Sequence, residues 1–164
     1  MRYNITASFE SNFRKFLPPF PPSFPPIEVP KSLTLLSSCV AKVVYHYTIP
    51  YLLALAHPTS TWTICTGAQG DVGLRPVAGI PQGALFSMCV SAARENLETN
   101  VRFNELYLAF RVEVDEDAKL HSVVSASEFA KVYEAILAKE EVRSARVRLD
   151  DVKDMDVLRF ERRF

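Results

Sequence analysis

The chain has 164 residues, of which 48% are apolar, and its 19 basic side chains balance 19 acidic ones. A chain of this length can bury a substantial core in one domain. Its balanced charge gives no overall attraction for nucleic acid or an anionic membrane, so we expect neither as a partner. The sequence shows no secretory signal and no uninterrupted membrane-spanning segment, which predicts a soluble, cytoplasmic protein.

Residues 1–30 differ in composition from the rest of the chain. Seven of the eleven prolines lie between Pro18 and Pro30. Proline fixes φ and lacks an N–H donor, so this segment is predicted to be an extended or disordered arm. Such an arm could bind an SH3- or WW-type domain, lie across a partner subunit, or be an unstructured leader that reflects only where the gene model starts.

Helical spacing of apolar residues predicts a first helix over residues 32–56, with Ser32 as a plausible N-cap. Pro50 should kink or end this helix. A β-branched strand is expected over residues 61–66. A second helix, apolar on more than one side and therefore buried, is expected over residues 82–96.

Residues 101–112 include a continuous apolar run that is typical of a central parallel strand. A capping box formed by Ser125 and Glu128 then opens a helix. The apolar stripe of this helix comprises Phe129, Val132, Tyr133, Ile136 and Leu137. Residues 142–149 alternate between apolar and basic side chains, which predicts an edge-like strand with one wet face. Helices alternating with strands indicate an α/β fold with a parallel sheet of about three strands.

The glycine-rich segment after the first strand allows two interpretations. Thr66-Gly67-Ala-Gln69-Gly70 resembles the start of a dinucleotide-binding loop, in which glycines allow the backbone to approach a pyrophosphate. In such loops the helix begins inside the motif, whereas here two prolines intervene and the helix is expected only near Gln82. A tight turn after a strand is therefore the preferred interpretation.

Other candidate groups point to structural roles. Cys39, Cys65 and Cys89 have no metal-type spacing and apolar neighbours, which predicts buried thiols in a reducing compartment. The three histidines are scattered, so no metal site is predicted. Four acids at residues 113–117 could bind a metal or a polar ligand, but a solvated loop is favoured. The arginines near the C-terminal end are interleaved with acids and have no aromatic platform for nucleic acid.

Three segments carry a resemblance to a known family. They are IPYLLALAHPTSTWTICTG, PQGALFSMCVSAARENLETNVRFNELYLAFRVEVD and SASEFAKVYEAILA. Residues 33–150 resemble the C-terminal half of a short-chain dehydrogenase/reductase of a divergent, fungal type. The resemblance implies a partial Rossmann-like sheet whose strands correspond to the fifth, sixth and seventh of the family. It also implies NAD(P) as cofactor, although the family's N-terminal cofactor-binding half is not represented in the sequence.

The resemblance transfers few catalytic residues. The family's catalytic Tyr and Lys positions fall on Ala78 and Gln82, and no Tyr-xxx-Lys pair occurs in the sequence. Cys65 or Thr66 occupies the position of the family's catalytic Ser, and Thr66 retains a hydroxyl. Thr66 is therefore the candidate catalytic residue, and Gly67, Gln69 and Gly70 are the candidate cofactor contacts.

The predicted organisation is a proline-rich arm over residues 1–30, a Rossmann-like half-domain over 31–150 and a charged tail over 151–164. The leading hypothesis is a divergent or truncated NAD(P)-dependent oxidoreductase acting on a small carbonyl or alcohol. The alternative is a non-catalytic homologue that associates through its apolar helices with itself or with a full-length paralogue. A third possibility is a gene model that lacks upstream exons.

Overall fold

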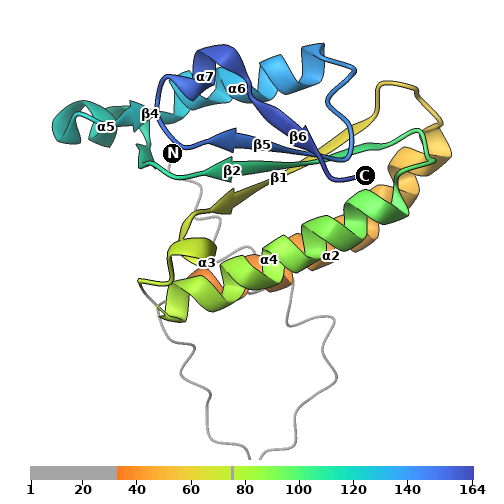
Figure 1. Ribbon diagram of the computed structural model, residues 1–164, viewed down its shortest axis with the longest axis horizontal. Coiled ribbons are helices and arrows are strands. Elements are labelled where there is room, and N and C mark those ends of the chain that lie inside the picture. Colours follow the sequence, from red (N-terminus) through yellow and green to blue (C-terminus); the bar gives the residue numbers. More distant parts are fainter. Residues whose placement is uncertain (1–32, 75) are drawn as a thin grey trace, which may run out of the picture. The chain divides into compact units, whose positions relative to one another are not determined.

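The computed structural model describes residues 33–74 and 76–164, so the predicted arm and the N-cap at Ser32 lie outside the described residues. Its centre is a four-stranded sheet in the order β1-β2-β5-β6, with helices on both faces (Figure 1). The strands are β1 (Thr61–Gly67), β2 (Arg102–Leu108), β5 (Ala145–Leu149) and β6 (Phe160–Arg162). The first three are parallel to one another. The α/β prediction is thus confirmed, and the arrangement is Rossmann-like.

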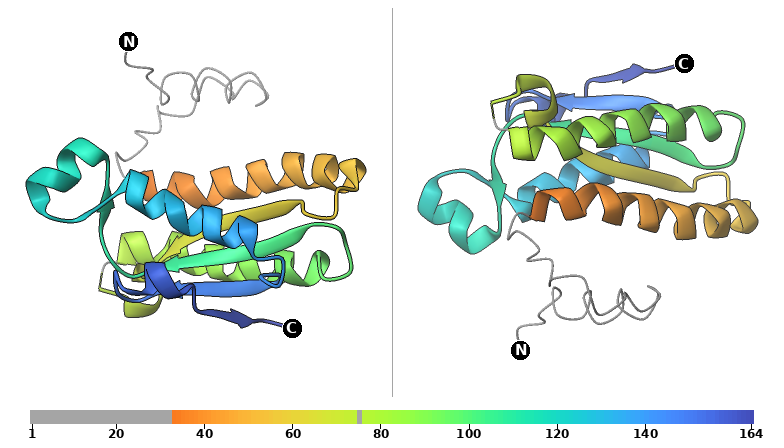
Figure 2. Two further views of the ribbon diagram at one scale, coloured as in Figure 1. Left: turned by 90° about the horizontal axis from the view of Figure 1, so that it is seen from above. Right: turned by 90° about the horizontal axis from the view of Figure 1, so that it is seen from below.

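Helices α2 (Leu33–Leu55) and α4 (Pro76–Glu95) cover one face of the sheet, as Figure 2 also shows. Between them and the sheet lies a core of buried apolar residues: Ile64, Leu85, Cys89, Ala92, Ala93 and Phe103. Helix α2 does not end at Pro50, which lies inside it. The missing N–H removes one backbone hydrogen bond, and packing of the helix against α4 and the sheet outweighs that loss.

Helix α4 begins six residues earlier than Gln82, the start predicted from sequence (82 − 76 = 6). The prediction was wrong because the prolines at 76 and 81 were interpreted as interruptions. Pro76 occupies the first helical position, where its fixed φ is favourable and no intrahelical N–H bond is lost. Pro81 lies in the second turn, where it removes a single hydrogen bond.

Helix α6 (Ala126–Ala138) and the short helix α7 (Asp154–Val157) pack on the opposite face. The predicted capping box is present: the Ser125 hydroxyl accepts from the Glu128 N–H, and the Glu128 carboxylate accepts from the Ser125 N–H. The buried core on this face comprises Leu106, Val132, Ile136, Val142, Ala145, Val147, Leu149 and Leu158. Leu137, predicted to belong to the apolar stripe, is instead exposed.

Strand β5 is not at the edge of the sheet, contrary to the expectation from its alternating pattern. The segment after residue 150 folds back, and β6 pairs antiparallel with β5, placing Phe160 opposite Val147. The backbone N–H and C=O groups of β5 are therefore paired on both sides. Among the described strands β1 lies at the other edge of the sheet. The division into 31–150 and a charged tail stays a prediction.

The strand predicted over residues 101–112 ends at Leu108, where the backbone leaves the sheet. Val112–Glu113 forms a separate strand, β3, which pairs in parallel with β4 (Val124–Ser125). Between them lies helix α5 (Asp115–His121), so the acidic segment predicted as a solvated loop is largely helical. Acidic side chains in a first helical turn are favourable because the N-terminal N–H groups carry partial positive charge.

Within residues 33–74 and 76–164, no helix is both long and apolar enough to span a membrane.

Candidate active site

The candidate site lies at the carboxyl ends of the parallel strands β1 and β2, where α/β proteins bind ligands. Strand β1 ends at Gly67 and leads directly into the one-turn helix α3 (Gln69–Val72). From the second turn of α4, Gln82 extends its side chain back to this junction, and its Oε1 accepts a hydrogen bond of 2.7 Å from the Gly67 N–H. The end of β1, α3 and the start of α4 are thus brought together.

Thr66 is buried beneath α4. Its hydroxyl donates a 2.7 Å hydrogen bond to Oε1 of Glu105, a fully buried residue of β2. The O–H group of Thr66, the predicted catalytic residue, is therefore already used in a hydrogen bond within the protein. A substrate oxygen could receive this proton only after the Thr66 hydroxyl turned away from Glu105. The catalytic role of Thr66 stays a prediction.

The glycines after β1 are used for packing. A Cβ atom added to Gly70 would lie 2.8 Å from the Phe86 Cζ and 3.0 Å from the Gln82 Cβ. Helix α3 can therefore lie against α4 only because residue 70 has no side chain. Gly73, with φ of 66°, ends α3 in the left-handed conformation that glycine adopts readily.

These observations test whether the loop fits a nucleotide phosphate. The N–H of Gly67 is donated to Gln82, and the space beside Gly70 is filled by Phe86. The loop therefore does not form an open phosphate cradle in this structure. Gln69 has a buried Oε1 without a hydrogen-bond partner among the described residues, which is the one unsatisfied acceptor there. Cofactor contact by Gly67, Gln69 and Gly70 stays a prediction.

The sequence patterns did not predict a buried ionic cluster that lies next to this site. Glu105 accepts from Arg146 Nε at 2.9 Å and Nη2 at 3.0 Å, and it also pairs with Arg163. Burial alone would lower the pKa of Arg146, but the hydrogen bond and charge of Glu105 outweigh it and raise that pKa. The sequence signal for this cluster was Glu105, a charged residue in the middle of the central strand β2.

Three comparisons with known proteins bear on the family. No family model matches the chain. No solved structure matches it. The chain is 50% identical over 122 residues to a curated protein of Pestalotiopsis fici (strain W106-1 / CGMCC3.15140) named "Short-chain dehydrogenase/reductase iacG". The match covers 71% of this chain and 49% of that protein, so the chain spans about half the length of the curated relative.

The chain is thus similar to about half of a protein named as a short-chain dehydrogenase/reductase. The resemblance stated from the sequence is thereby confirmed. In a short-chain dehydrogenase/reductase, the Tyr and Lys of the Tyr-xxx-Lys pair share one face of a helix. The positions matched to them here, Ala78 and Gln82, lie in the first two turns of α4. An alanine cannot transfer a proton, and the Gln82 amide instead fixes the backbone at Gly67.

The second residue at the family's Ser position, Cys65, is on the opposite face of the sheet from Thr66, facing α6. Burial raises the pKa of its thiol to about 11, although a hydrogen bond with Tyr133 acts in the opposite direction. A thiol with so high a pKa has very little of the reactive thiolate at neutral pH. Cys65 is therefore not an activated nucleophile.

The remaining cysteines differ from each other. Cys89 is buried, as predicted, and burial raises its pKa to about 12. Cys39 is exposed on α2, so the prediction of a buried thiol was wrong there. Its position was inferred from apolar neighbours in the sequence, but the outward face of α2 is itself partly apolar.

The acidic segment around α5 is held by local pairs. Glu113 accepts from His121 Nδ1 at 2.7 Å and also pairs with Arg111, while Asp115 accepts from the Ser127 N–H at 3.0 Å. Hydrogen bonds from His121 and then from Arg111 lower the pKa of Glu113. Within the described ranges, no three His, Cys, Asp or Glu side chains are grouped to hold a metal ion.

Proposed function

We propose that this chain acts as a divergent oxidoreductase of the short-chain dehydrogenase/reductase type, using NAD(P) and a small carbonyl or alcohol substrate. The observation that carries the proposal is its 50% identity over 122 residues to a protein named as a member of that family. The fold supports it, because Thr66 lies near the carboxyl end of the parallel strand β1 and the side chain of Gln82 reaches that end from α4. Thr66 is the hydroxyl that would hold a substrate oxygen.

The proposal is tested by titrating the purified full chain with NADPH and NADH, following nucleotide fluorescence and melting temperature. We expect micromolar binding and turnover of a small carbonyl. Thr66→Val should lower kcat, whereas Thr63→Val, at the position three residues earlier in β1, should leave it unchanged. Melting temperatures of both variants show whether they fold. An absence of binding at millimolar nucleotide would contradict the proposal.

A second candidate function has its own structural support. We propose that the chain associates through α2 and α4 with a second copy or with a full-length relative. A mostly apolar groove of about 400 Å³ lies between these helices, lined by residues that include Tyr45, Leu85 and Met88. On the outer face of α2, Tyr47 is 70% exposed and Tyr51 is 65% exposed. An apolar groove and exposed aromatic side chains are each typical of surfaces that bind another protein, although here they lie on different faces of α2.

Sedimentation equilibrium of the full chain, alone and mixed with the purified fungal relative, tests this candidate. Ala84→Arg places a charge in the groove and should convert the assembly to monomer. Leu120→Arg, at an exposed position on α5, is the matched control and should leave association unchanged. A monomer at all concentrations, with no complex formed with the relative, would exclude it.

A further inference from the structure

We propose that the free side of strand β1 binds a strand of another polypeptide, which runs parallel to β1 and belongs to the remaining half of a short-chain dehydrogenase/reductase. Among the described strands, β1 has a single neighbour, β2, so its other side forms one edge of the four-stranded sheet. This side is called the β1 edge below. The proposal concerns association alone, so it does not depend on catalysis or on the groove between α2 and α4.

The backbone direction of each β1 residue follows from the two ends of its ladder with β2. The Arg102 N–H donates to the Ser60 carbonyl oxygen at 2.8 Å, and the Ala68 N–H donates to the Leu108 carbonyl oxygen at 3.0 Å. In a parallel ladder, every second residue of a strand directs its N–H and its C=O to the same neighbour. The even-numbered residues from 60 to 68 therefore face β2, and the odd-numbered residues from 61 to 67 face the β1 edge.

Most hydrogen-bonding groups at the β1 edge have no partner among the described residues. The Gly67 N–H donates to Gln82 Oε1 at 2.7 Å, which closes the edge at its carboxyl end. From Thr61 to Cys65, the backbone N–H and C=O groups that face this edge make no hydrogen bond within the part of the chain that the structure describes. Such a row of free donors and acceptors is a template for an added strand.

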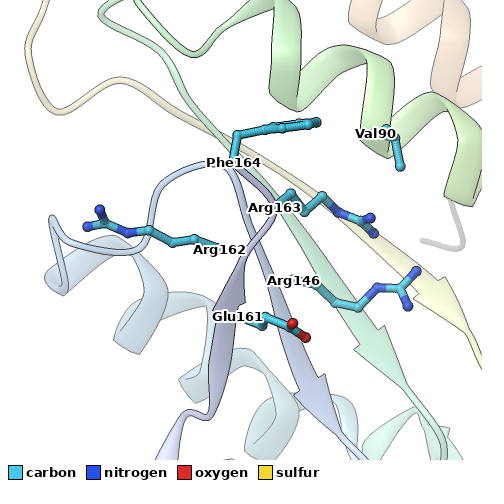
Figure 3. Close-up of a pocket in the computed structure, with 6 residues that line it drawn as sticks. All are labelled: Val90, Arg146, Glu161, Arg162, Arg163 and Phe164. Carbon is cyan, nitrogen blue, oxygen red and sulfur yellow. The ribbon is translucent and has the colours of Figure 1, made fainter.

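The two edges of the sheet differ in their protection against another chain. At the far edge, β6 has three residues, and Figure 3 shows the charged side chains of two of them, Glu161 and Arg162. Short length and charge both keep an edge strand from pairing with another chain. Strand β1 has seven residues, of which four are β-branched and none is charged or proline. It therefore has the composition of a strand that is paired on both sides.

Helix α2 extends past the β1 edge. In both views of Figure 2, α2 lies on the side of β1 that is away from β2. Its Thr48 hydroxyl accepts a 2.9 Å hydrogen bond from Trp62 Nε1, which marks the flank of α2 next to β1. Val44 and Leu55 lie one turn before and two turns after Thr48 on this flank, and they are 43% and 52% exposed. A strand added to β1 would rest on this flank and cover both side chains.

The position of α2 also selects the partner. Two copies of β1 could pair only as antiparallel strands about a two-fold axis, which would bring both α2 helices to the same face beside the same two strands. A parallel strand from a different chain brings no second α2. Parallel strands covered by helices belong to α/β domains. The match covers 49% of the fungal relative, so the remaining half of that protein is a stretch of similar length that is long enough to carry such strands.

Co-expression tests the proposal. The remaining half of the Pestalotiopsis fici relative is produced together with the full chain as a separate polypeptide, with an affinity tag on the full chain only. We expect the two to be purified together in equimolar amounts, as measured by sedimentation velocity. Recovery of the full chain without the relative's half would overturn the proposal.

Variants at Cys65 test whether the β1 edge is the binding surface. Cys65→Pro removes an N–H that faces the edge and should weaken binding by about tenfold or more, because a carbonyl oxygen of the added strand loses its donor. Cys65→Ala also removes the thiol but keeps the N–H, so it should bind as the wild type does. Ala84→Arg, in the groove between α2 and α4, should likewise leave this binding unchanged. Equal binding of Cys65→Pro and Cys65→Ala would overturn the proposal.

Amide hydrogen exchange of the unaltered chain gives a second readout, which decides the matter if Cys65→Pro does not fold. In the free chain the Cys65 N–H should exchange quickly, whereas the Ile64 N–H, which faces β2, should be protected. Binding of the relative's half should protect Cys65 and leave Ile64 unchanged. Protection of Cys65 in the free chain would show that the edge is already covered, and continued rapid exchange in the complex would show that it is not used. Either result would overturn the proposal.

Discussion

Arg102 is a buried cation that serves a helix end. Its Nη1 donates to the carbonyl oxygens of Ile136, Lys139 and Val142 at 3.3, 2.7 and 3.4 Å, and its Nη2 donates to Leu137 at 3.0 Å. These carbonyls belong to the last turn of α6 and the residues after it, where the helix itself offers no N–H donors. The positive charge also suits the negative end of the helix. Burial lowers the pKa of this guanidinium, and the nearby charge of Glu140 acts in the opposite direction.

Arg102→Met should therefore lower the free energy of unfolding by about 3 kcal/mol, since several buried carbonyls lose a charged donor. Chemical denaturation of the two proteins measures the difference. Arg111→Met is the control, because the Arg111 side chain is 61% exposed and its loss should cost well under about 1 kcal/mol. Equal losses of unfolding free energy in the two variants would show that the contacts of Arg102 with the carbonyl oxygens do not stabilise the fold.

Tyr45 links the two helices on the first face. Its hydroxyl donates to Glu95 Oε2 at 2.8 Å and accepts from Asn96 Nδ2 at 2.8 Å. Burial first, and then the hydrogen bond to Glu95, raise the pKa of this phenol from 10.0 to about 12. The folded state thus resists ionisation of Tyr45, whereas the unfolded state does not.

The contribution of Tyr45 to the free energy of unfolding should therefore depend on pH. The contribution of Tyr45 is present in full below pH 10, the unfolded value, and is lost as the pH rises from 10 to about 12. The stability difference between the wild type and Tyr45→Phe should shrink between pH 9 and pH 11.5. Urea unfolding at both pH values measures it, with Tyr47→Phe as an exposed control. A difference that is constant with pH would contradict the prediction.

At the scale of elements, α3 and α4 fit together because of one missing side chain. Gly70 lies against Phe86, and no other residue type leaves this space free. Gly83, inside α4, has no atom within 4 Å of the position of an added Cβ. The two glycines therefore have opposite roles, although both lie in helices.

Gly70→Ala should destabilise the protein by about 1–3 kcal/mol, because the new methyl group overlaps the Phe86 ring. Gly83→Ala should stabilise it by about 0.5–1 kcal/mol, because alanine restricts the unfolded chain and meets no obstacle. Thermal or urea unfolding of both variants gives the comparison. The double variant Gly70→Ala, Phe86→Leu should recover part of the loss. Destabilisation by both single substitutions to the same extent would refute this account.

At the scale of the whole molecule, the three thiols report on different depths of the fold. Cys39 is exposed, Cys65 is partly buried, and Cys89 lies between α4 and the sheet. Burial holds the pKa of Cys65 at about 11 and that of Cys89 at about 12. The reactive thiolate is therefore scarce at both side chains at neutral pH, and Cys89 is in addition fully buried.

In native protein at pH 8, a disulfide reagent should therefore modify one thiol rapidly and two slowly. The slow phase should follow global stability: mild denaturant should accelerate it, and Gly70→Ala should do so as well. Cys39→Ser should remove the fast phase. Rapid modification of all three thiols would show that the layers on the two faces of the sheet are not closed.

The sequence by itself determined the type and order of the main elements α2, β1, α4, β2, α6 and β5, but not of the short elements between and after them. Apolar spacing gave α2 and α6, the Ser125–Glu128 box located the start of α6, and β-branched and continuous apolar runs marked β1 and β2. These signals are local, because helix and strand periodicity are written in neighbouring residues. The family resemblance followed from the same segments and not from any catalytic pair.

Only the tertiary structure decided which distant segments of the chain are in contact. It showed that β6 covers β5, that Pro81 is tolerated inside a packed helix, and that Glu105 gathers Thr66, Arg146 and Arg163 from three other segments of the chain. The partners of Glu105 are separated from it by 39, 41 and 58 residues. No local pattern encodes such pairs, because their energy arises only when strands distant in sequence bring opposite charges together in a buried place.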